Sequence, residues 1–187
     1  QKALEFTEKA YELRCKMLGE GHPDTLILLG NLACEYGKLG EHQKALELAK
    51  KAYELRCKVL GEEHPDTLVS LNNLAREYSK LGEHQKALEL TNKEYELSCK
   101  VLGEEHPNTL TLLNNLAYEY GEYGEYQKAL ELKKKAYELR CKVLGEEHPD
   151  TLISLNDLAY EYGEYGEHQK ALELTKKEYE LSCKVLG

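Results

Sequence analysis

Histidine and cysteine are the side chains here best suited to chemistry at neutral pH, and they recur at fixed intervals. The chain has 7 histidines and 6 cysteines. Four histidines precede prolines in equivalent loops: His22, His64, His106 and His148. Three more begin predicted helices, where we expect capping or contact with solvent: His42, His84 and His168. Neither His-x-x-x-His nor Cys-x-x-Cys occurs, so we predict no metal ion and no cofactor.

The cysteines favour packing over reactivity. Five of them lie one per repeat: Cys15, Cys57, Cys99, Cys141 and Cys183. None has a second cysteine at a fixed short distance, so we interpret them as small buried hydrophobes and not as disulfides. Cys34 lies outside this series and is the one thiol we expect to be accessible. Unpaired cysteines indicate a reducing compartment, and we predict a cytoplasmic location.

The remaining residue types give no support for catalysis. The sequence has no glycine-rich phosphate loop, no nucleophile elbow and no Ser-His-Asp arrangement. Tyrosines between Tyr118 and Tyr126 could stack nucleobases, but Glu119, Glu122 and Glu125 lie among them, and stacking platforms need basic surroundings. A net charge of −9 disfavours nucleic acid and anionic membranes. No apolar run approaches the roughly 20 residues that span a bilayer. We therefore predict a non-enzyme whose partner is a protein or peptide.

Two segments recur every 42 residues and set the architecture. His-Pro-Asp-Thr-Leu begins at three of the four loop histidines, and Asn108 replaces the aspartate in the copy at His106. Gln-Lys-Ala-Leu-Glu begins at Gln1, Gln43, Gln85, Gln127 and Gln169. A longer period of 84 also exists, because residues 43–103 and 127–187 differ at only 8 of 61 positions. A recent duplication or deliberate design would leave that trace. Since Gln1 lies within a repeat, we expect a longer parent chain.

Each repeat is predicted to hold two helices. In the first, about 66–81, apolar residues from Leu68 onward follow helical spacing. Pro65 suits the first helical position and Gly82 the end. The second helix, about 43–60, carries two neighbouring apolar stripes, which indicates more than one partner helix. These stripes are Ala45, Leu48, Ala52, Leu55 and Val59, and Leu46, Ala49, Tyr53, Cys57 and Leu60. Strand signals are absent, and stacking would bury faces that one helix pair cannot.

The repeat resembles the tetratricopeptide repeat, most closely the 42-residue type of kinesin light chains. Four features carry the resemblance: Leu71-Asn72-Asn73-Leu74-Ala75 with Tyr78, Gly82, Ala87 and the Leu-Gly…His-Pro-Asp linker. The resemblance implies an all-α, right-handed superhelical solenoid of stacked antiparallel helix pairs. We expect one array over 1–187. It would comprise a second helix at 1–18 and repeats at about 22–60, 64–102, 106–144 and 148–186.

One position departs from the family pattern. A small residue is expected where Ala52 stands, but Glu94 and Glu178 occupy the equivalent positions in alternate copies. Where glutamate occurs, the residue four positions later is serine instead of arginine. We therefore predict that Glu94 pairs with an arginine of an adjacent repeat, Arg56 or Arg140.

Comparison of the four first helices points to a binding surface. The apolar positions are identical in every copy, whereas a second stripe at helical spacing varies. We call this second set the variable stripe. Its members are Ile27, Gly30, Asn31, Cys34 and Lys38; Val69, Asn72, Asn73, Arg76 and Lys80; Thr111, Asn114, Asn115, Tyr118 and Glu122; Ile153, Asn156, Asp157, Tyr160 and Glu164. In the resembled family, the corresponding stripe lines a concave groove that receives an extended peptide.

The stripe also has suitable chemistry. Asn72, Asn114 and Asn156 each offer a donor and an acceptor to a peptide backbone, and Tyr118 and Tyr160 offer flat contact area. Basic residues precede acidic ones along the chain, which would orient a partner of mixed charge. The alternative is an ordinary exposed face whose asparagines bond neighbouring helices, because exposed polar helix faces are common.

Several functions remain open from the sequence. The first is an interaction scaffold that binds an extended peptide. The second is a self-associating module, in which helices at the two ends stack on further copies. A third is the sensory or interaction array of a larger signalling ATPase, and a fourth is a consensus-like design without a partner.

Overall fold

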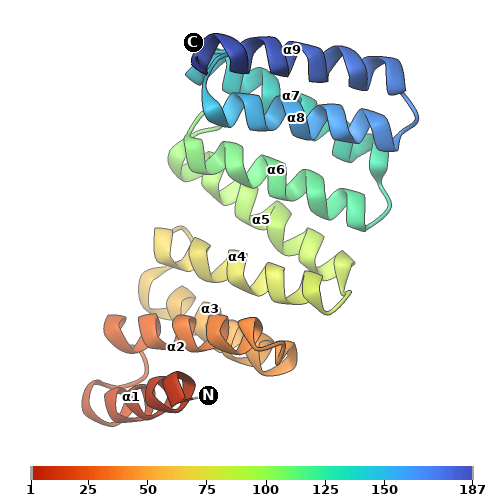
Figure 1. The fold of residues 1–187 in the computed structure, drawn as a ribbon. Helices are drawn as coiled ribbons and strands as arrows, with labels where there is room; N and C mark the ends of the chain where they lie inside the picture. The colour runs from red at the N-terminus through yellow and green to blue at the C-terminus, as the bar shows by residue number, and fades with distance from the viewer. Residues whose placement is uncertain (1, 187) are drawn as a thin grey trace. The chain divides into compact units, whose positions relative to one another are not determined.

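The computed structural model describes residues 2–186, with side chains from Leu4 to Val185. This range forms nine helices and no strand (Figure 1). The first helices of the repeats are α2 (Pro23–Lys38), α4 (Pro65–Lys80), α6 (Pro107–Glu122) and α8 (Pro149–Glu164). The second helices are α1 (Lys2–Leu18), α3 (His42–Leu60), α5 (His84–Leu102), α7 (Tyr126–Leu144) and α9 (His168–Leu186). The all-α prediction is confirmed.

Each first helix begins at a proline that follows a histidine cap. Nδ1 of His64 accepts a 3.2 Å hydrogen bond from the backbone N–H of Asp66, and the bond recurs in the other three copies. The ring thus takes the acceptor role that Ser, Thr, Asp or Asn usually has at an N-cap. Pro65 follows, where the helix needs no donor. Capping or solvent contact was predicted for His42, His84 and His168. His168 is exposed, whereas the half-buried His42 also contacts a buried carboxylate described below.

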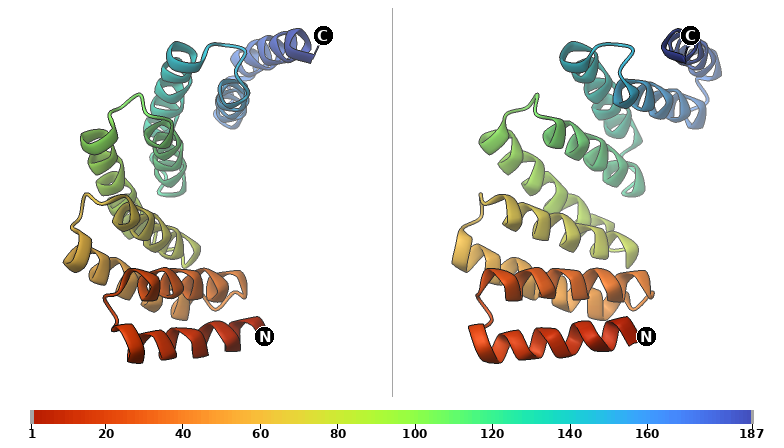
Figure 2. Two further views of the ribbon diagram at one scale, coloured as in Figure 1. Left: turned by 90° about the vertical axis from the view of Figure 1, so that its left-hand side faces the viewer. Right: turned by 60° about the vertical axis from the view of Figure 1, so that its left-hand side comes forward.

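The helices pack into two compact units, the first ending at Val101 and the second beginning at Leu102. In the first unit α1 packs on α2, α2 on α3 and α3 on α4, and α2 also contacts α4. In the second unit α6 packs on α7, α7 on α8 and α8 on α9. Consecutive helices within each unit run antiparallel and are joined by short loops (Figure 2). Each unit is therefore a stack of antiparallel helix pairs.

The first helices supply most of the core. In α4 four of the five predicted apolar positions are buried, namely Leu68, Leu71, Leu74 and Ala75, whereas Tyr78 is half-buried. The second helices contribute mainly small residues, and in α3 these are Ala45, Ala49 and Ala52. Leu46, Leu48 and Tyr53 also pack against the core but are only partly buried, so the predicted stripes are less buried than expected at their edges. Val59 is 50% exposed.

In α3, α5, α7 and α9 one lysine contacts a glutamate in the loop that precedes the first helix of the same repeat. Lys93 Nζ donates hydrogen bonds to the Tyr53 hydroxyl at 3.0 Å and to Glu62 Oε1 at 3.1 Å. Lys177 makes the same two contacts in the second unit, both at 3.0 Å. Such exposed pairs contribute little singly, but their recurrence fixes the register between successive second helices.

The cysteines are less buried than predicted. Cys57 and its equivalents are half-buried, except that Cys183 is exposed. Cys34 is also half-buried, so the prediction that it alone is accessible was wrong. The Cys57 thiol contacts the side chain of Tyr53, one turn earlier in α3. Burial, opposed by Lys93, raises the pKa of Tyr53, and the contact with Cys57 raises it further.

Candidate functional site

The variable stripe lies outside the core in both units. Each of its residues is half-buried or exposed, whereas the identical positions Leu71 and Ala75 are buried. The exposed large apolar members are Ile27, Val69, Tyr118, Ile153 and Tyr160. The predicted site residues therefore share an accessible helix face within each unit, which any docking surface requires.

Asn72 of the stripe is partly engaged within the fold. Its Nδ2 donates a 3.0 Å hydrogen bond to Glu94 Oε2 in α5. For Asn72, therefore, the alternative prediction that the asparagines of the stripe bond a neighbouring helix is confirmed. Glu94 is only 4% exposed. Burial raises the pKa of its carboxyl from 4.5 to about 7, and the hydrogen bond from Asn72 opposes that rise. The Glu94 carboxyl is thus held by an amide, and the predicted partner, an arginine, was wrong.

The arginine expected to pair with Glu94 bonds neutral oxygens instead. Nη1 of Arg56 donates to the Asp66 carbonyl oxygen at 2.9 Å and to Ser70 Oγ at 2.6 Å. Its Nη2 donates to the Leu26 carbonyl oxygen at 3.4 Å. Burial lowers the pKa of Arg56. Arg140 makes equivalent contacts in the second unit. These oxygens satisfy the guanidinium, which explains why the predicted pair does not form.

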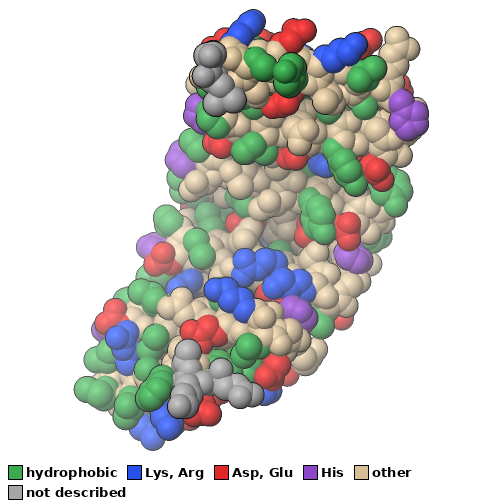
Figure 3. All heavy atoms as spheres, in the orientation of Figure 1, with side chains coloured by type: hydrophobic (Ala, Val, Ile, Leu, Met, Phe, Trp, Pro, Cys, Tyr) green, Lys and Arg blue, Asp and Glu red, His purple; other side chains and the backbone are tan. Residues whose placement is uncertain are grey.

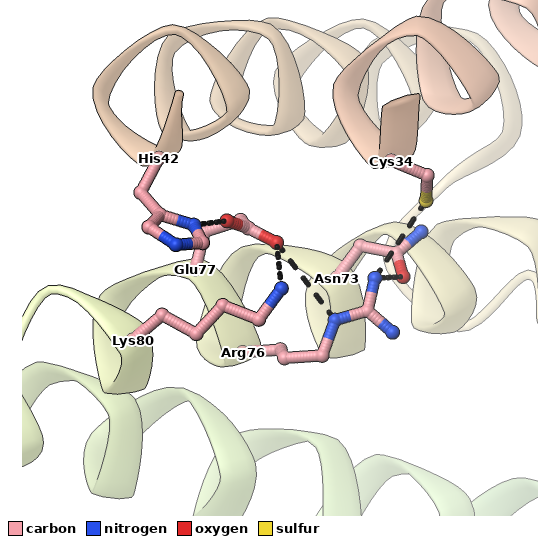
Figure 4. Close-up of polar contacts among 6 residues, drawn as sticks. All are labelled: Cys34, His42, Asn73, Arg76, Glu77 and Lys80. Atoms are coloured by element: carbon pink, nitrogen blue, oxygen red, sulfur yellow. Dashed lines mark hydrogen bonds and ion pairs between the residues drawn. The ribbon is translucent and has the colours of Figure 1, made fainter. Parts of the chain in front are cut away.

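A buried carboxylate lies directly behind the stripe of α4 (Figure 4). Glu77 is 2% exposed, and its Oε2 lies 3.1 Å from Nδ1 of His42. Its Oε1 accepts a hydrogen bond from Lys80 Nζ at 3.3 Å, and Nε of Arg76 lies 3.8 Å away. A Cβ on Gly37 would lie 2.8 Å from Glu77 Oε1, so the glycine leaves room for this carboxyl group. Glu77 therefore orients two basic members of the stripe.

Arg76 connects the stripes of two first helices (Figure 4). Its Nη2 donates to Asn73 Oδ1 at 3.0 Å on the same helix and contacts Cys34 Sγ of α2 at 3.6 Å. Lys38 and Lys80 are exposed at the ends of α2 and α4. Figure 3 shows Lys and Arg side chains gathered over α4. The stripe of the first unit is thus a basic surface.

The second unit has a hollow of about 860 Å³. Among its lining residues are those that lie 84 positions after Cys34, Lys38, Arg76 and Lys80. Four tyrosines contribute to its wall: Tyr118, Tyr126, Tyr160 and Tyr165. The rings of Tyr126 and Tyr165 meet edge to face, with centroids 6.3 Å apart and planes at 78°. Such pairs are favourable beyond their buried area, which helps to hold the wall in place.

Three carboxylates and one lysine complete the charge of the hollow. Glu122 and Glu164 are exposed, whereas Glu161 forms an ion pair with Lys133 of α7 whose side chains are only 13% and 18% exposed. Burial and nearby carboxylates, Glu122 first among them, raise the pKa of Tyr118. The stripe of the second unit is therefore aromatic and acidic.

Sequence reasoning placed Tyr118, Glu122, Tyr160 and Glu164 on this surface but missed the second-helix contribution. Lys133 and Tyr126 belong to α7, and only the first helices were compared for variation. A signal was present, because Lys133 stands where the other second helices have Thr7, Ala49, Thr91 and Thr175. A charged residue at a position that is otherwise small marks a local change of environment.

No group of three or more His, Cys, Asp or Glu side chains in the described part of the chain could hold a metal ion. No helix within residues 2–186 is long and apolar enough to cross a membrane.

Comparison with known proteins places the fold and the repeat. Sequence models of the tetratricopeptide repeat match residues 1–58, 55–100 and 109–150. A protein of Podosopora anserina, assigned as a kinesin light chain with nearly identical TPR-like repeats, is 34% identical. That alignment covers 99% of this chain and 88% of the other, with a TM-score of 0.89. The comparison with curated protein sequences finds no match.

More distant structures share the fold. BtubC (BKLC) from P. vanneervenii is 23% identical and has a TM-score of 0.84, covering 100% of this chain and 74% of its own. A Rap protein complexed with Competence and Sporulation Factor is 15% identical and has a TM-score of 0.73, covering 97% and 48%. The chain belongs to the tetratricopeptide repeat family, and its resemblance to kinesin-light-chain-type repeats is confirmed.

Proposed function

We propose that this protein is an interaction scaffold whose variable stripe forms a groove for an extended peptide. One observation carries the proposal. The apolar positions that are identical among the first helices are packed, whereas every position of the stripe is at least partly accessible. Diversity confined to an accessible face, on a constant core, is expected of a surface that selects a ligand. Binding, and not catalysis, is the proposed activity.

The charge of the two stripes supports a partner of mixed composition. The first unit presents Lys38, Arg76 and Lys80, and the second presents Glu122 and Glu164. Complementary charge would fix the direction of a bound peptide and raise its association rate. A structural relative was crystallised with Competence and Sporulation Factor, so this architecture accommodates a bound factor. We also propose a cytoplasmic location, because the six cysteines are free.

Combined substitution of Asn114, Tyr118, Asn156 and Tyr160 by alanine tests the groove. These side chains are half-buried or exposed, so we expect peptide binding to weaken by tenfold or more, since hot-spot truncations cost about 2 kcal/mol. The melting temperature should change little. A peptide array followed by fluorescence anisotropy measures binding, and circular dichroism measures melting. Undiminished binding, or a large fall in melting temperature, would assign these residues a structural role.

Self-association is a second candidate, favoured by exposed apolar side chains on α1 and α9. Phe6 and Met17 are 71% and 78% exposed, and Tyr179 is 68% exposed. Light scattering at increasing protein concentration should show growing assemblies if these helices stack on further copies. Phe6→Glu with Met17→Glu should then restore the monomer. A constant monomer mass for the unmodified protein contradicts this second function.

A further inference from the structure

The 84-residue duplication provides an internal comparison for the hollow of the second unit. Residues 22–103 and 106–187 differ at 15 of 82 positions. Seven of these differences fall among the ten positions that line the hollow. The rest of the duplicated chain, including its core, is nearly unchanged. The differences are therefore concentrated at the hollow, because seven of its ten positions differ but only eight of the other 72 do.

The direction of the divergence is chemically consistent. Cys34, His42, Arg76 and Leu81 correspond to the four tyrosines Tyr118, Tyr126, Tyr160 and Tyr165. Lys38 and Lys80 correspond to Glu122 and Glu164. A basic surface in one copy thus corresponds to an aromatic, acidic hollow in the other. Aromatic rings and carboxylates share one kind of ligand, which is a cation.

The two exposed carboxylates occupy helix ends that favour the opposite charge. Glu122 ends α6 and Glu164 ends α8, and the C-terminal end of a helix carries partial negative charge. Lysine suits that position, as Lys38 and Lys80 show in the first unit. The glutamates therefore oppose the helix dipole while they concentrate negative charge at the hollow.

We propose that the hollow between α6, α7 and α8 binds a lysine or arginine side chain of the peptide partner. This inference rests on the peptide groove proposed above. The tyrosine rings in the wall supply aromatic surface for a cation–aromatic contact, and Glu122 and Glu164 neutralise the charge. Lys133 does not compete with the guest, because it is paired with Glu161 at the base of the site. Its charge cancels that of Glu161 and leaves the hollow with a net negative charge.

The test is a peptide-display selection against three forms of the full chain. One is the unmodified protein, the second carries Glu122→Lys and Glu164→Lys, and the third carries Glu131→Lys and Glu173→Lys. The third is a matched control, because it makes the same change in net charge at exposed positions outside the hollow. Selected peptides are then resynthesised with norleucine in place of the enriched cation and titrated against each form.

We expect lysine or arginine to be enriched at one peptide position by the unmodified protein and the control. The Glu122→Lys, Glu164→Lys form should lose this preference, and binding of the cationic peptide should fall by about tenfold or more, because two attractive carboxylates are replaced by repelling ammonium groups. Two results would overturn the cation site alone. In the first, the selected peptides share no lysine or arginine position; in the second, the Glu131→Lys, Glu173→Lys control loses the preference as fully as the Glu122→Lys, Glu164→Lys form. Failure of all three forms to select any peptide overturns the groove itself, and the cation site with it.

Discussion

Replacing Glu94 with glutamine should stabilise the protein at pH 8 and have little effect at pH 4.5. The carboxyl is buried, and its pKa is raised from 4.5 to about 7. Below pH 4.5 it is protonated in both the folded and the unfolded states, so burial of a charge costs nothing there. As pH rises from 4.5 through 7, the unfolded state ionises first, and the free energy of unfolding falls by up to about 3 kcal/mol. Above pH 7 that penalty is constant.

Urea denaturation of the two proteins across pH 4.5 to 8 measures this difference. Subtracting the mutant from the unmodified protein removes the contribution of every other titrating group. Glu178→Gln is the matched control, because the same residue in α9 is half-buried and accepts a 2.7 Å hydrogen bond from Ser182. If the difference in free energy of unfolding between the two proteins does not grow between pH 4.5 and pH 7, the pKa of Glu94 is not raised by burial.

Replacing Arg56 with alanine should destabilise the protein by about 2–4 kcal/mol, since each hydrogen bond from a charged donor contributes about 1.5–3 kcal/mol and these bonds are not additive. The change removes the donors that hold Ser70 Oγ and the carbonyl oxygens of Asp66 and Leu26. These oxygens lie at the start of α4 and within α2, so one guanidinium joins three helices.

Arg14 provides the control within the same repeat series. It occupies the equivalent position in α1, is exposed, and donates to the Asp24 carbonyl oxygen at 3.2 Å. Arg14→Ala should therefore change the free energy of unfolding by no more than about 0.5 kcal/mol. Equal losses for the two variants in urea denaturation would show that burial of the guanidinium contributes nothing.

Much of the fold could be predicted from the sequence because its determinants are local. Pro65 and the glycines after each helix set the helix bounds, and the spacing of Leu68, Leu71 and Leu74 defined the buried face. Repetition multiplied each of these signals. The burial of the second helices was overestimated, because helical periodicity identifies an apolar stripe but not which of its edges a neighbour covers, as Val59 shows.

The candidate site could be predicted only in part, because its polar contacts join residues that are far apart in the chain. The variation among first helices pointed to Tyr118 and Tyr160, which line the hollow. Nothing local indicates that Lys133 reaches Glu161, or that Glu94 meets Asn72 and not an arginine. Such pairs depend on side-chain reach between helices, and several oxygens compete for each buried cation.

The lysine that reaches back one repeat has a consequence for how such a chain can grow. Each 42-residue segment carries a lysine that contacts the preceding segment, and a tyrosine and a glutamate that the lysine of the following segment contacts. Lys93, for example, bonds Tyr53 and Glu62 of the segment before it. A segment copied in tandem therefore already carries the residues that form these contacts with both of its neighbours. Lengthening the protein by gene duplication therefore needs no new contact residues. The copies can then diverge in sequence at every position that does not take part in these contacts.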